Sequence, residues 1–373
     1  MKVIFLFNFY NSFRSIVENN EFTTVGNISL IRIIKKISLN NFVQIYLLEK
    51  NKNSKINKIT KTKINNIEFK VIPLNNKYNI LKNIPIMLKE FLLSCPKTFY
   101  IDRGNIIFAY ILKVLTKHKV IIRILGITQV IEESLIGFSL RNYFNRIFWK
   151  KRYDLVINSN DGSNYKKFYL NNMSSKNIYL TLNQAVDKFH KIKTIRKKFN
   201  ILLCDNFKSI YKNFSEILET LNFINPDIKK KIKLIFIYSD KNEKLKIKKN
   251  TISFNDIKLI PRQDNKKLLN HKFNCDALIT FNSMGYLSNN ICESIYCNNW
   301  IITPYYSKIA ANIPTKLKKN FVFINKKNLK IELNRTISKL LNESKNLQFK
   351  NILTNQNKIE KEINFLKTTK LIN

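Results

Sequence analysis

The sequence predicts an α/β protein made of two doubly wound domains, and three features of the 373-residue chain support this. Short apolar runs of strand length alternate with segments of helical spacing along most of the chain, which is typical of parallel sheets. The clearest unit is residues 276–304, DALITFNSMGYLSNNICESIYCNNWIITP, which read as strand, loop, helix and strand. The chain is also long enough for two domains that each bury a core.

In the first half of the chain, a buried strand is expected at residues 2–7, whose apolar stretch ends before Asn8. This run is too short for a signal peptide, and no other run is apolar enough over about 18 residues to cross a membrane. Further strands are expected at residues 42–49, 69–74, 98–102, 119–126 and 153–160, and helices at 23–38, 84–93, 106–115 and 140–149.

A polar, basic run at residues 191–199 has the composition of a linker, so the first domain is predicted to span residues 1–195 and the second residues 196–373. Residues 200–224 begin the second domain with a strand and an amphipathic helix. Strands are then expected at 233–240, 251–256, 276–281, 300–303 and 321–324, and helices at 288–297, 329–341 and 355–367.

The net charge is extreme at +41, from 66 Lys and Arg against 25 Asp and Glu. Binding to nucleic acid, contact with an anionic membrane and a lysine- and asparagine-rich composition are three explanations. Composition is favoured because the lysines are scattered along the whole chain. Specific binding of nucleic acid is not expected, since the sequence contains no recognisable nucleic-acid-binding motif and no clustered basic stripe. A positive surface would still attract anionic lipid, by roughly 1 kcal/mol for each basic residue near it.

Several chemistries lack their motifs. The five cysteines include no C-x-x-C pair and the three histidines are far apart, so neither a disulfide framework nor a zinc site is expected, and a reducing cytoplasm fits best. The sequence contains no G-x-x-x-x-G-K-[ST] and no G-x-G-x-x-G, which argues against P-loop ATPases and dinucleotide-dependent enzymes. It also contains no Asp-x-Asp, a common metal-binding motif.

The helix within residues 276–304 carries the strongest candidate site. Asn290 is predicted as its N-cap, and Glu293, three positions later, completes a capping box. A helix N-terminus presents unpaired N–H groups and about half a positive charge to a phosphate. A nucleotide diphosphate could therefore bind there while Glu293 accepts hydrogen bonds from ribose hydroxyls. The alternative is that Glu293 only caps the helix.

This segment resembles the donor-binding motif of retaining GT-B glycosyltransferases of group four (glycosyl transferases group 1), typically E-G-x-S/P-N-x-x-x-E-A before a short strand and a proline. Ser288, Asn289 and Glu293 match the motif, and Pro304 closes the strand. The first glutamate, which contacts the donor sugar in that family, is replaced by Gly285.

Other segments resemble the family less closely. Lys212, followed by Asn213, resembles the family's lysine that meets the donor diphosphate, and Lys208 is the cation nearest to Phe207, which stands in place of an arginine. The alternative for both lysines is that they are exposed to solvent and contact no diphosphate.

In the first domain, the family has a glycine pair in the loop before the first helix, and Gly26 is what remains of that pair here. Gly26 would let the backbone approach a ligand, or it is only a turn glycine. Leu125, with Arg123 nearby, stands where the family usually has a histidine. Residues 177–189 resemble the N-G-V-D segment that closes the first domain.

The resemblance implies a GT-B-like fold, in which two Rossmann-like domains face a central cleft and the C-terminal helix crosses back to the first domain. It implies a retaining, metal-independent transfer of a sugar from a nucleotide-sugar donor, with no further cofactor. The acceptor would be a glycan or a lipid-linked acceptor, as in the synthesis of cell-surface polysaccharide or lipopolysaccharide. The enzyme would act in the cytoplasm, in peripheral contact with the anionic inner face of the membrane.

The residues that the resemblance assigns fall into two groups. The catalytic ones are Lys212 and Glu293, and those that bind the donor are Gly26, Lys208, Gly285, Ser288, Asn289, Asn290 and Glu293. Two alternatives stay open: a degenerate GT-B scaffold or partner subunit, suggested by Gly285, Leu125 and Phe207, and a basic nucleic-acid-binding protein.

Overall fold

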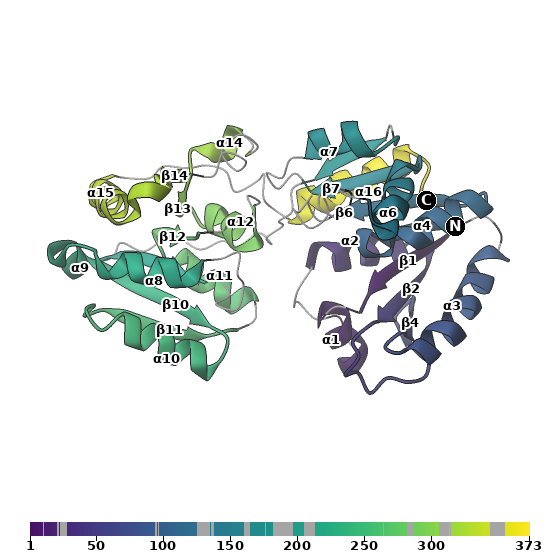
Figure 1. The fold of residues 1–373 in the computed structure, drawn as a ribbon, viewed down its shortest axis with the longest axis horizontal. Coiled ribbons are helices and arrows are strands. Elements are labelled where there is room, and N and C mark those ends of the chain that lie inside the picture. The colour runs from purple at the N-terminus through teal and green to yellow at the C-terminus, as the bar shows by residue number, and fades with distance from the viewer. Residues whose placement is uncertain are drawn as a thin grey trace. The chain divides into compact units, whose positions relative to one another are not determined.

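The computed structural model describes residues 1–9, 11–20, 22, 28–93, 95, 97–124, 135, 138–159, 165–175, 177–181, 197–204, 213–263, 265–281, 287–305, 313, 315–343 and 355–373. The chain divides into two compact units (Figure 1). The first comprises residues 1–160, 164–182 and 358–373, and the second comprises residues 161–163 and 183–357. Each unit has its own sheet and its own hydrophobic core.

Eight described strands form the sheet of the first unit, in the order β3-β4-β2-β1-β5-β6-β7-β8. All neighbours are parallel except β3 and β4, a hairpin whose two-residue turn begins at Asn65 in the left-handed region that asparagine tolerates (φ 54°). The strands are β1 (Lys2–Asn8), β2 (Phe42–Glu49), β3 (Thr60–Ile64), β4 (Ile67–Pro73), β5 (Thr98–Asp102), β6 (Lys119–Ile124), β7 (Leu155–Ser159) and β8 (Ile178–Thr181).

Helices cover both faces of this sheet, which explains why the central strands are apolar without alternation. One face packs against α1 (Asn11–Asn19), α2 (Ile28–Ser38) and α16 (Asn355–Thr368). The other packs against α3 (Lys77–Leu92), α4 (Ile106–Leu115), α6 (Leu140–Lys150) and α7 (Tyr165–Asn172), and a short 3-10 turn, η1 (Arg103–Asn105), precedes α4.

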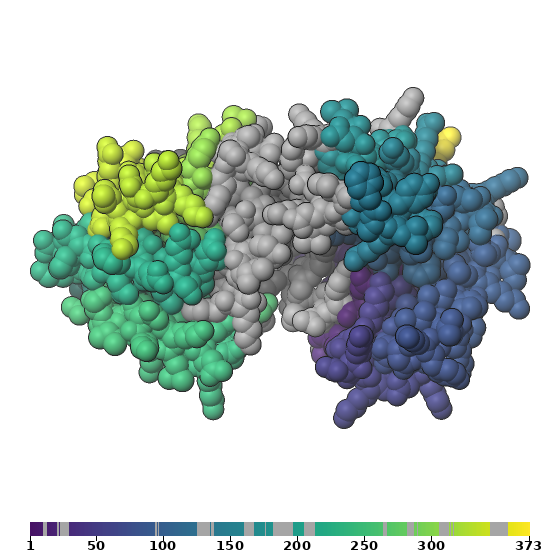
Figure 2. All heavy atoms as spheres, in the orientation of Figure 1, coloured from purple at the N-terminus to yellow at the C-terminus, as the bar shows by residue number. Residues whose placement is uncertain are grey.

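The C-terminal helix α16 packs within the first unit, as the predicted fold class requires. Glu362 on this helix is fully buried, and its Oε1 accepts hydrogen bonds from Arg123 Nη1 on β6 at 2.6 Å and from the Tyr100 hydroxyl on β5 at 2.9 Å. In the space-filling view only a small yellow patch of this C-terminal segment emerges beside the teal residues of the same unit (Figure 2).

The second unit has a parallel sheet of six described strands in the order β11-β10-β9-β12-β13-β14. Numbered within the unit, this is 3-2-1-4-5-6, the strand order of a Rossmann fold. The strands are β9 (Phe199–Leu203), β10 (Ile232–Tyr238), β11 (Ile257–Pro261), β12 (Ala277–Ile279), β13 (Trp300–Pro304) and β14 (Phe321–Ile324). The same order, extended by further strands, occurs in the first sheet.

The described helices of the second unit are α8 (Phe214–Asn222), α9 (Pro226–Lys231), α10 (Lys241–Asn250), α11 (Asn265–Phe273), α12 (Asn289–Tyr296), α14 (Thr315–Lys318), the 3-10 turn η3 (Lys326–Asn328) and α15 (Leu329–Leu341). Helices α8 and α15 pack together on the sheet through buried aliphatic residues. Helix α12 contacts α11 and the strands β12 and β13.

The predicted α/β fold with two doubly wound halves is confirmed. The strand predicted at residues 251–256 was wrong, because Thr251 ends α10 and its carbonyl accepts a turn hydrogen bond from Phe254 N, so that β11 begins only at Ile257. Helices α1, α7, α9, α10 and α14 and strands β3 and β8 were not predicted. The boundary predicted at residues 195 and 196 lies outside the described residues and stays a prediction.

Candidate functional site

The strand order of the second unit alone indicates where a ligand would bind. Strands β9 and β12 are neighbours in the sheet. From β9 the chain continues to β10 toward one edge of the sheet, and from β12 it continues to β13 toward the other edge. Open parallel sheets bind ligands at such a switch point, outside the carboxyl ends of the strands. Here those ends are Leu203 on β9 and Ile279 on β12.

Two helix starts are bonded to these strand ends. Asn290, in the first turn of α12, donates from Nδ2 to the carbonyl oxygen of Cys204, just after β9, at 3.1 Å. Asn213, at the start of α8, donates from Nδ2 to the carbonyl oxygen of Phe281, just after β12, at 3.2 Å. The N-termini of both helices, with their unpaired N–H groups, therefore lie at the carboxyl edge of the sheet.

The backbone of Asn213 explains why a glycine or asparagine suits this position. Its φ of 45° lies in the left-handed region, which is open to glycine and tolerated by asparagine. The residue immediately before it, Lys212, is one of the predicted catalytic residues and lies outside the described residues.

The N-cap of helix α12 lies two residues earlier than the sequence suggested. Ser288 is the N-cap, and its Oγ accepts a hydrogen bond from Ile291 N at 3.4 Å. The prediction that Asn290 caps the helix, with Glu293 closing a capping box, was therefore wrong. Ser288 takes the capping role because it stands at the extended residue before the first turn, which leaves Asn290 and Glu293 for other contacts.

Those contacts converge on Lys272 of α11. Its ammonium donates to Glu293 Oε2 and, at 2.9 Å, to Asn290 Oδ1. The lysine side chain is only 1% exposed, whereas that of Glu293 is 13% exposed. The carboxylate thus lies nearer the surface than its cation, so that a ligand at the start of α12 could meet it.

Electrostatics keep this lysine charged. Burial alone would lower the pKa of the Lys272 ammonium, but the neighbouring Glu293 carboxylate, with smaller effects from Cys204 and Cys297, raises its pKa above the usual value. A buried ion pair of this kind is fixed in geometry, because each partner would be costly to leave alone. Lys272 therefore orients Glu293 at the helix start.

The predicted site residues divide into two groups. Ser288, Asn290 and Glu293 come together at the start of α12. Asn289 is the first residue of the helix, although its side chain is not described. Gly26, Lys208, Lys212 and Gly285 lie outside the described residues, as do Leu125 and Phe207.

Arg123, noted beside Leu125, is fully buried against Glu362 and Tyr100 and so serves the interior of the first unit. Lys272 was missed altogether. The chain has 66 lysines and arginines, and no spacing in the sequence distinguishes the one that α11 buries.

The described residues contain no group of three or more His, Cys, Asp or Glu side chains placed to hold a metal ion. Within the same ranges, none of the helices combines the length and the apolar character needed to cross a bilayer.

No protein-family model matches this chain, and no curated protein matches its sequence. Solved structures match its fold over nearly the full length. Sucrose-phosphate synthase from Thermosynechococcus elongatus has a TM-score of 0.69 at 10% identity, with 99% of this chain and 98% of that chain covered. An α,α-trehalose-phosphate synthase (UDP-forming) from Burkholderia vietnamiensis has a TM-score of 0.61 at 8% identity, with 100% and 97% covered.

A third match is the trehalose-6-phosphate protein from E. coli bound with UDP-2-fluoro glucose, with a TM-score of 0.60 at 11% identity and with 99% and 95% of the two chains covered. At these identities the likeness concerns the fold. The chain therefore has the GT-B fold of two Rossmann-like domains that the resemblance implied.

Proposed function

We propose that this protein is a glycosyltransferase that takes a sugar from a nucleotide-sugar donor. The observation that carries the proposal is the start of α12, where a capped helix N-terminus and an oriented carboxylate lie at the switch point of a Rossmann-like sheet. The structures that share its fold support it, since they include two sugar-phosphate synthases and a complex with a UDP-sugar analogue.

Each part of the site has a role in this proposal. The N–H groups of the first turn of α12 bind the donor diphosphate, and they stabilise the charge that develops as the sugar leaves. Glu293 accepts hydrogen bonds from the ribose hydroxyls, with Lys272 holding its carboxylate in place. Lys212 adds a positive charge to the diphosphate. Because these groups supply the positive potential, we propose that the transfer needs no metal or further cofactor. We also propose that the anomeric configuration of the sugar is retained.

For the acceptor, we propose a glycan or lipid-linked molecule of the polysaccharide type, used in the cytoplasm at an anionic membrane surface. Helices α3, α4 and α6 form one layer of the first unit and expose large apolar side chains beside lysines and arginines. Examples are Tyr78 and Leu81 on α3 and Tyr143 on α6, and the ammonium of Lys82 lies 5.8 Å from the centroid of the Tyr78 ring. A mixture of basic and apolar side chains suits the headgroup region of an anionic bilayer.

The second candidate is a scaffold with the same fold and no transfer activity. The ion pair between Lys272 and Glu293 favours it, because this contact would hold α12 against α11 whether or not a donor binds. In that case Glu293 would be a structural residue.

Thermal denaturation with nucleotide sugars, together with an assay of donor consumption, distinguishes the two candidates. UDP-, GDP-, ADP- and CMP-sugars are each added in moderate salt, which screens non-specific attraction to the net charge of +41. Ligand at about 100 times its dissociation constant stabilises the folded protein by roughly 2.7 kcal/mol, a rise of a few degrees in Tm. We expect one nucleotide class to give this rise.

Two variants assign the rise to the site. The double variant Lys272→Met/Glu293→Gln removes both charges of the pair together and should lose the response while remaining folded. Glu332→Gln, at another carboxylate of the same unit in the first turn of α15, should keep it. If no nucleotide sugar raises Tm and none is consumed with glycan or lipid-linked acceptors, the scaffold is the better description.

A further inference from the structure

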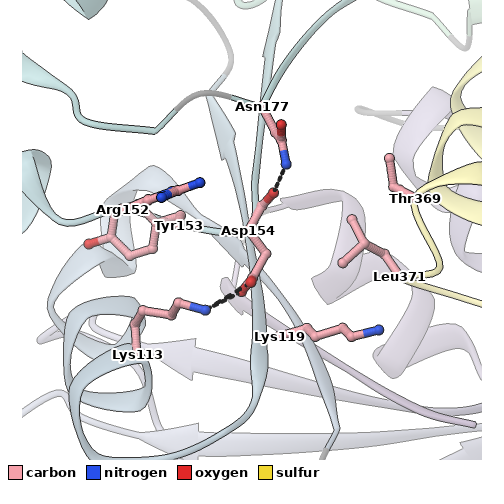
Figure 3. A pocket seen from close by; sticks show the side chains of 8 residues that line it. All are labelled: Lys113, Lys119, Arg152, Tyr153, Asp154, Asn177, Thr369 and Leu371. Carbon is pink, nitrogen blue, oxygen red and sulfur yellow. Dashed lines mark hydrogen bonds and ion pairs between the residues drawn. The ribbon is translucent and has the colours of Figure 1, made fainter.

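A second candidate site lies in the first unit, at the amino ends of the strands of its sheet. A cavity of about 330 Å³ is lined by Lys113, Lys119, Arg152, Tyr153, Asp154, Asn177, Thr369 and Leu371 (Figure 3). Lys119 is the first residue of β6, and Asp154 and Asn177 immediately precede β7 and β8. The cavity is therefore at the amino ends of the strands, away from the carboxyl edge at which open parallel sheets bind their main ligand.

The charge in this cavity is unbalanced. Three cationic side chains line it against a single carboxylate, Asp154. That carboxylate already accepts two hydrogen bonds from Lys113 Nζ, at 2.8 and 2.7 Å, and one from Val120 N at 2.7 Å. Lys113 and Asp154 thus neutralise each other, and the positive charges of Lys119 and Arg152 are left over.

These two side chains retain donors that a ligand could use. Lys119 Nζ donates to the carbonyl oxygen of Lys370 at 2.6 Å, which occupies one of its three protons. Arg152 is exposed, and its guanidinium forms no hydrogen bond or ion pair within the described ranges of the chain. In Figure 3 both side chains are seen around the central Asp154.

We propose that this cavity binds a phosphate monoester. The planar fork of Arg152 suits two oxygens of a phosphate, Lys119 adds a second positive charge, and Asn177 has one amide proton beyond the one that it donates to the Asp154 carbonyl. The volume exceeds that of a phosphate group alone. Tyr153 and Leu371 line the remaining wall, where they can contact the carbon skeleton of the ester.

This site does not depend on the proposed transfer reaction. All its residues belong to the first unit, whereas the α12 site belongs to the second. Binding is therefore measured without a donor, and either proposal can fail while the other stands. The phosphate could come from a soluble ester or from a lipid headgroup, and two probes separate these sources.

The test uses calorimetric titration of the full-length protein with glycerol 3-phosphate, with glycerol as the neutral probe and sodium chloride to match ionic strength. Vesicles of phosphatidylcholine with and without phosphatidic acid are the lipid probe. We expect Arg152→Gln to weaken phosphate binding by about tenfold or more, the usual effect of losing a hydrogen-bonded charge. This substitution removes no described contact, so the fold should persist, and Lys119→Gln should weaken binding as well.

The matched control is Arg141→Gln, at an exposed arginine of α6 outside the cavity. A response to glycerol 3-phosphate that depends on Arg152 assigns a soluble ester. A response confined to phosphatidic acid vesicles, again dependent on Arg152, assigns a headgroup. Equal losses in Arg152→Gln and Arg141→Gln would show that only net charge matters, and this result, or no binding of either probe, would overturn the proposal.

Discussion

Lys272 shows how a single buried side chain determines what its neighbour can do. Its ammonium is enclosed and bonded to Glu293 and Asn290, so the carboxylate has one fixed position at the start of α12. Removing the carboxylate alone leaves a buried charge without its partner. We predict that Glu293→Gln lowers the free energy of unfolding by about 3–5 kcal/mol.

Chemical denaturation of three proteins checks this prediction: the wild type, Glu293→Gln and the double variant Lys272→Met/Glu293→Gln. The double variant should recover most of the loss, because no unpaired charge remains inside. If the single and double variants are equally unstable, the pair contributes packing rather than electrostatic compensation. The double variant is also the one in which loss of nucleotide binding reports on chemistry and not on unfolding.

Lys97, just before β5, gives a prediction about pH. Burial of its ammonium, together with the nearby ammonium of Lys2, lowers the pKa of Lys97 to about 8, from a usual value of 10.5. Between these two values the unfolded chain binds more protons than the folded one, so the stability of the folded state rises with pH. Below pH 8 the lysine is charged in both states and remains buried at a cost.

Substitution Lys97→Met removes this titration. The free energy of unfolding of the wild type minus that of the variant should therefore increase as pH rises from about 8 to about 10.5. Urea denaturation of both proteins across this range measures it, with Lys117→Met, at an exposed lysine of the same edge, as the control for losing one charge. A difference that stays flat with pH would contradict the assignment.

At the scale of elements, the sequence predicted best those segments whose burial follows a simple period. The bounds expected for β2, β5, α4, β14 and α15 are those observed, because each has an apolar run or stripe that ends at a polar or turn-forming residue. Helix α10 was missed since its sequence, KNEKLKIKKN, buries only Glu243 and Ile247 and shows no apolar stripe.

The candidate site was predictable only in part, because some of its contacts join segments that are far apart in the sequence. The helix of the site follows from local pattern, and so does the likeness of its spacing to a known motif. The role of Glu293 in binding a donor stays a prediction. The cap was misplaced because Ser288 and Asn290 are both good N-caps two residues apart. The partner of Glu293 comes from a different helix, and only the packing of α11 on α12 brings Lys272 to it.

Helix α16 is held to the first unit by a buried polar network as well as by apolar packing. Glu362 and Arg123 are almost completely enclosed, and the Arg123 guanidinium contacts Tyr100 as well as Glu362. The Glu362 carboxylate raises the pKa of Arg123 further above its usual value even though burial opposes this, so the cation persists. We predict that Glu362→Gln destabilises the first unit by about 3–5 kcal/mol.

Denaturant titration of this variant should show the loss in the transition of the first unit. Glu360→Gln changes an exposed carboxylate on the same helix and should have an effect within about 0.5 kcal/mol. The double replacement Arg123→Met/Glu362→Leu should be close to the wild type. Equal effects at positions 360 and 362 would mean that apolar packing alone holds α16.

At the scale of the whole molecule, the charge of +41 has to be separated from any specific surface. Charge alone attracts lipid and nucleic acid alike, and this attraction weakens as the Debye length falls to about 8 Å at physiological salt. Insertion of apolar side chains does not weaken in this way, because the hydrophobic effect is not screened by salt. Salt dependence therefore distinguishes the scattered lysines from the helical layer of α3, α4 and α6.

We predict that binding to vesicles containing phosphatidylserine persists in part above about 0.15 M salt, where bare attraction is mostly screened. The variant Tyr78→Ser/Leu81→Ser removes two exposed apolar side chains of α3 without changing charge and should lose the persistent part. Leu245→Ser/Ile252→Ser, a matched pair of exposed residues in the second unit, should keep it. Vesicle sedimentation over a range of salt concentrations measures all three proteins. If salt abolishes every interaction equally, the positive charge reflects composition, and the acceptor should then be sought among soluble glycans.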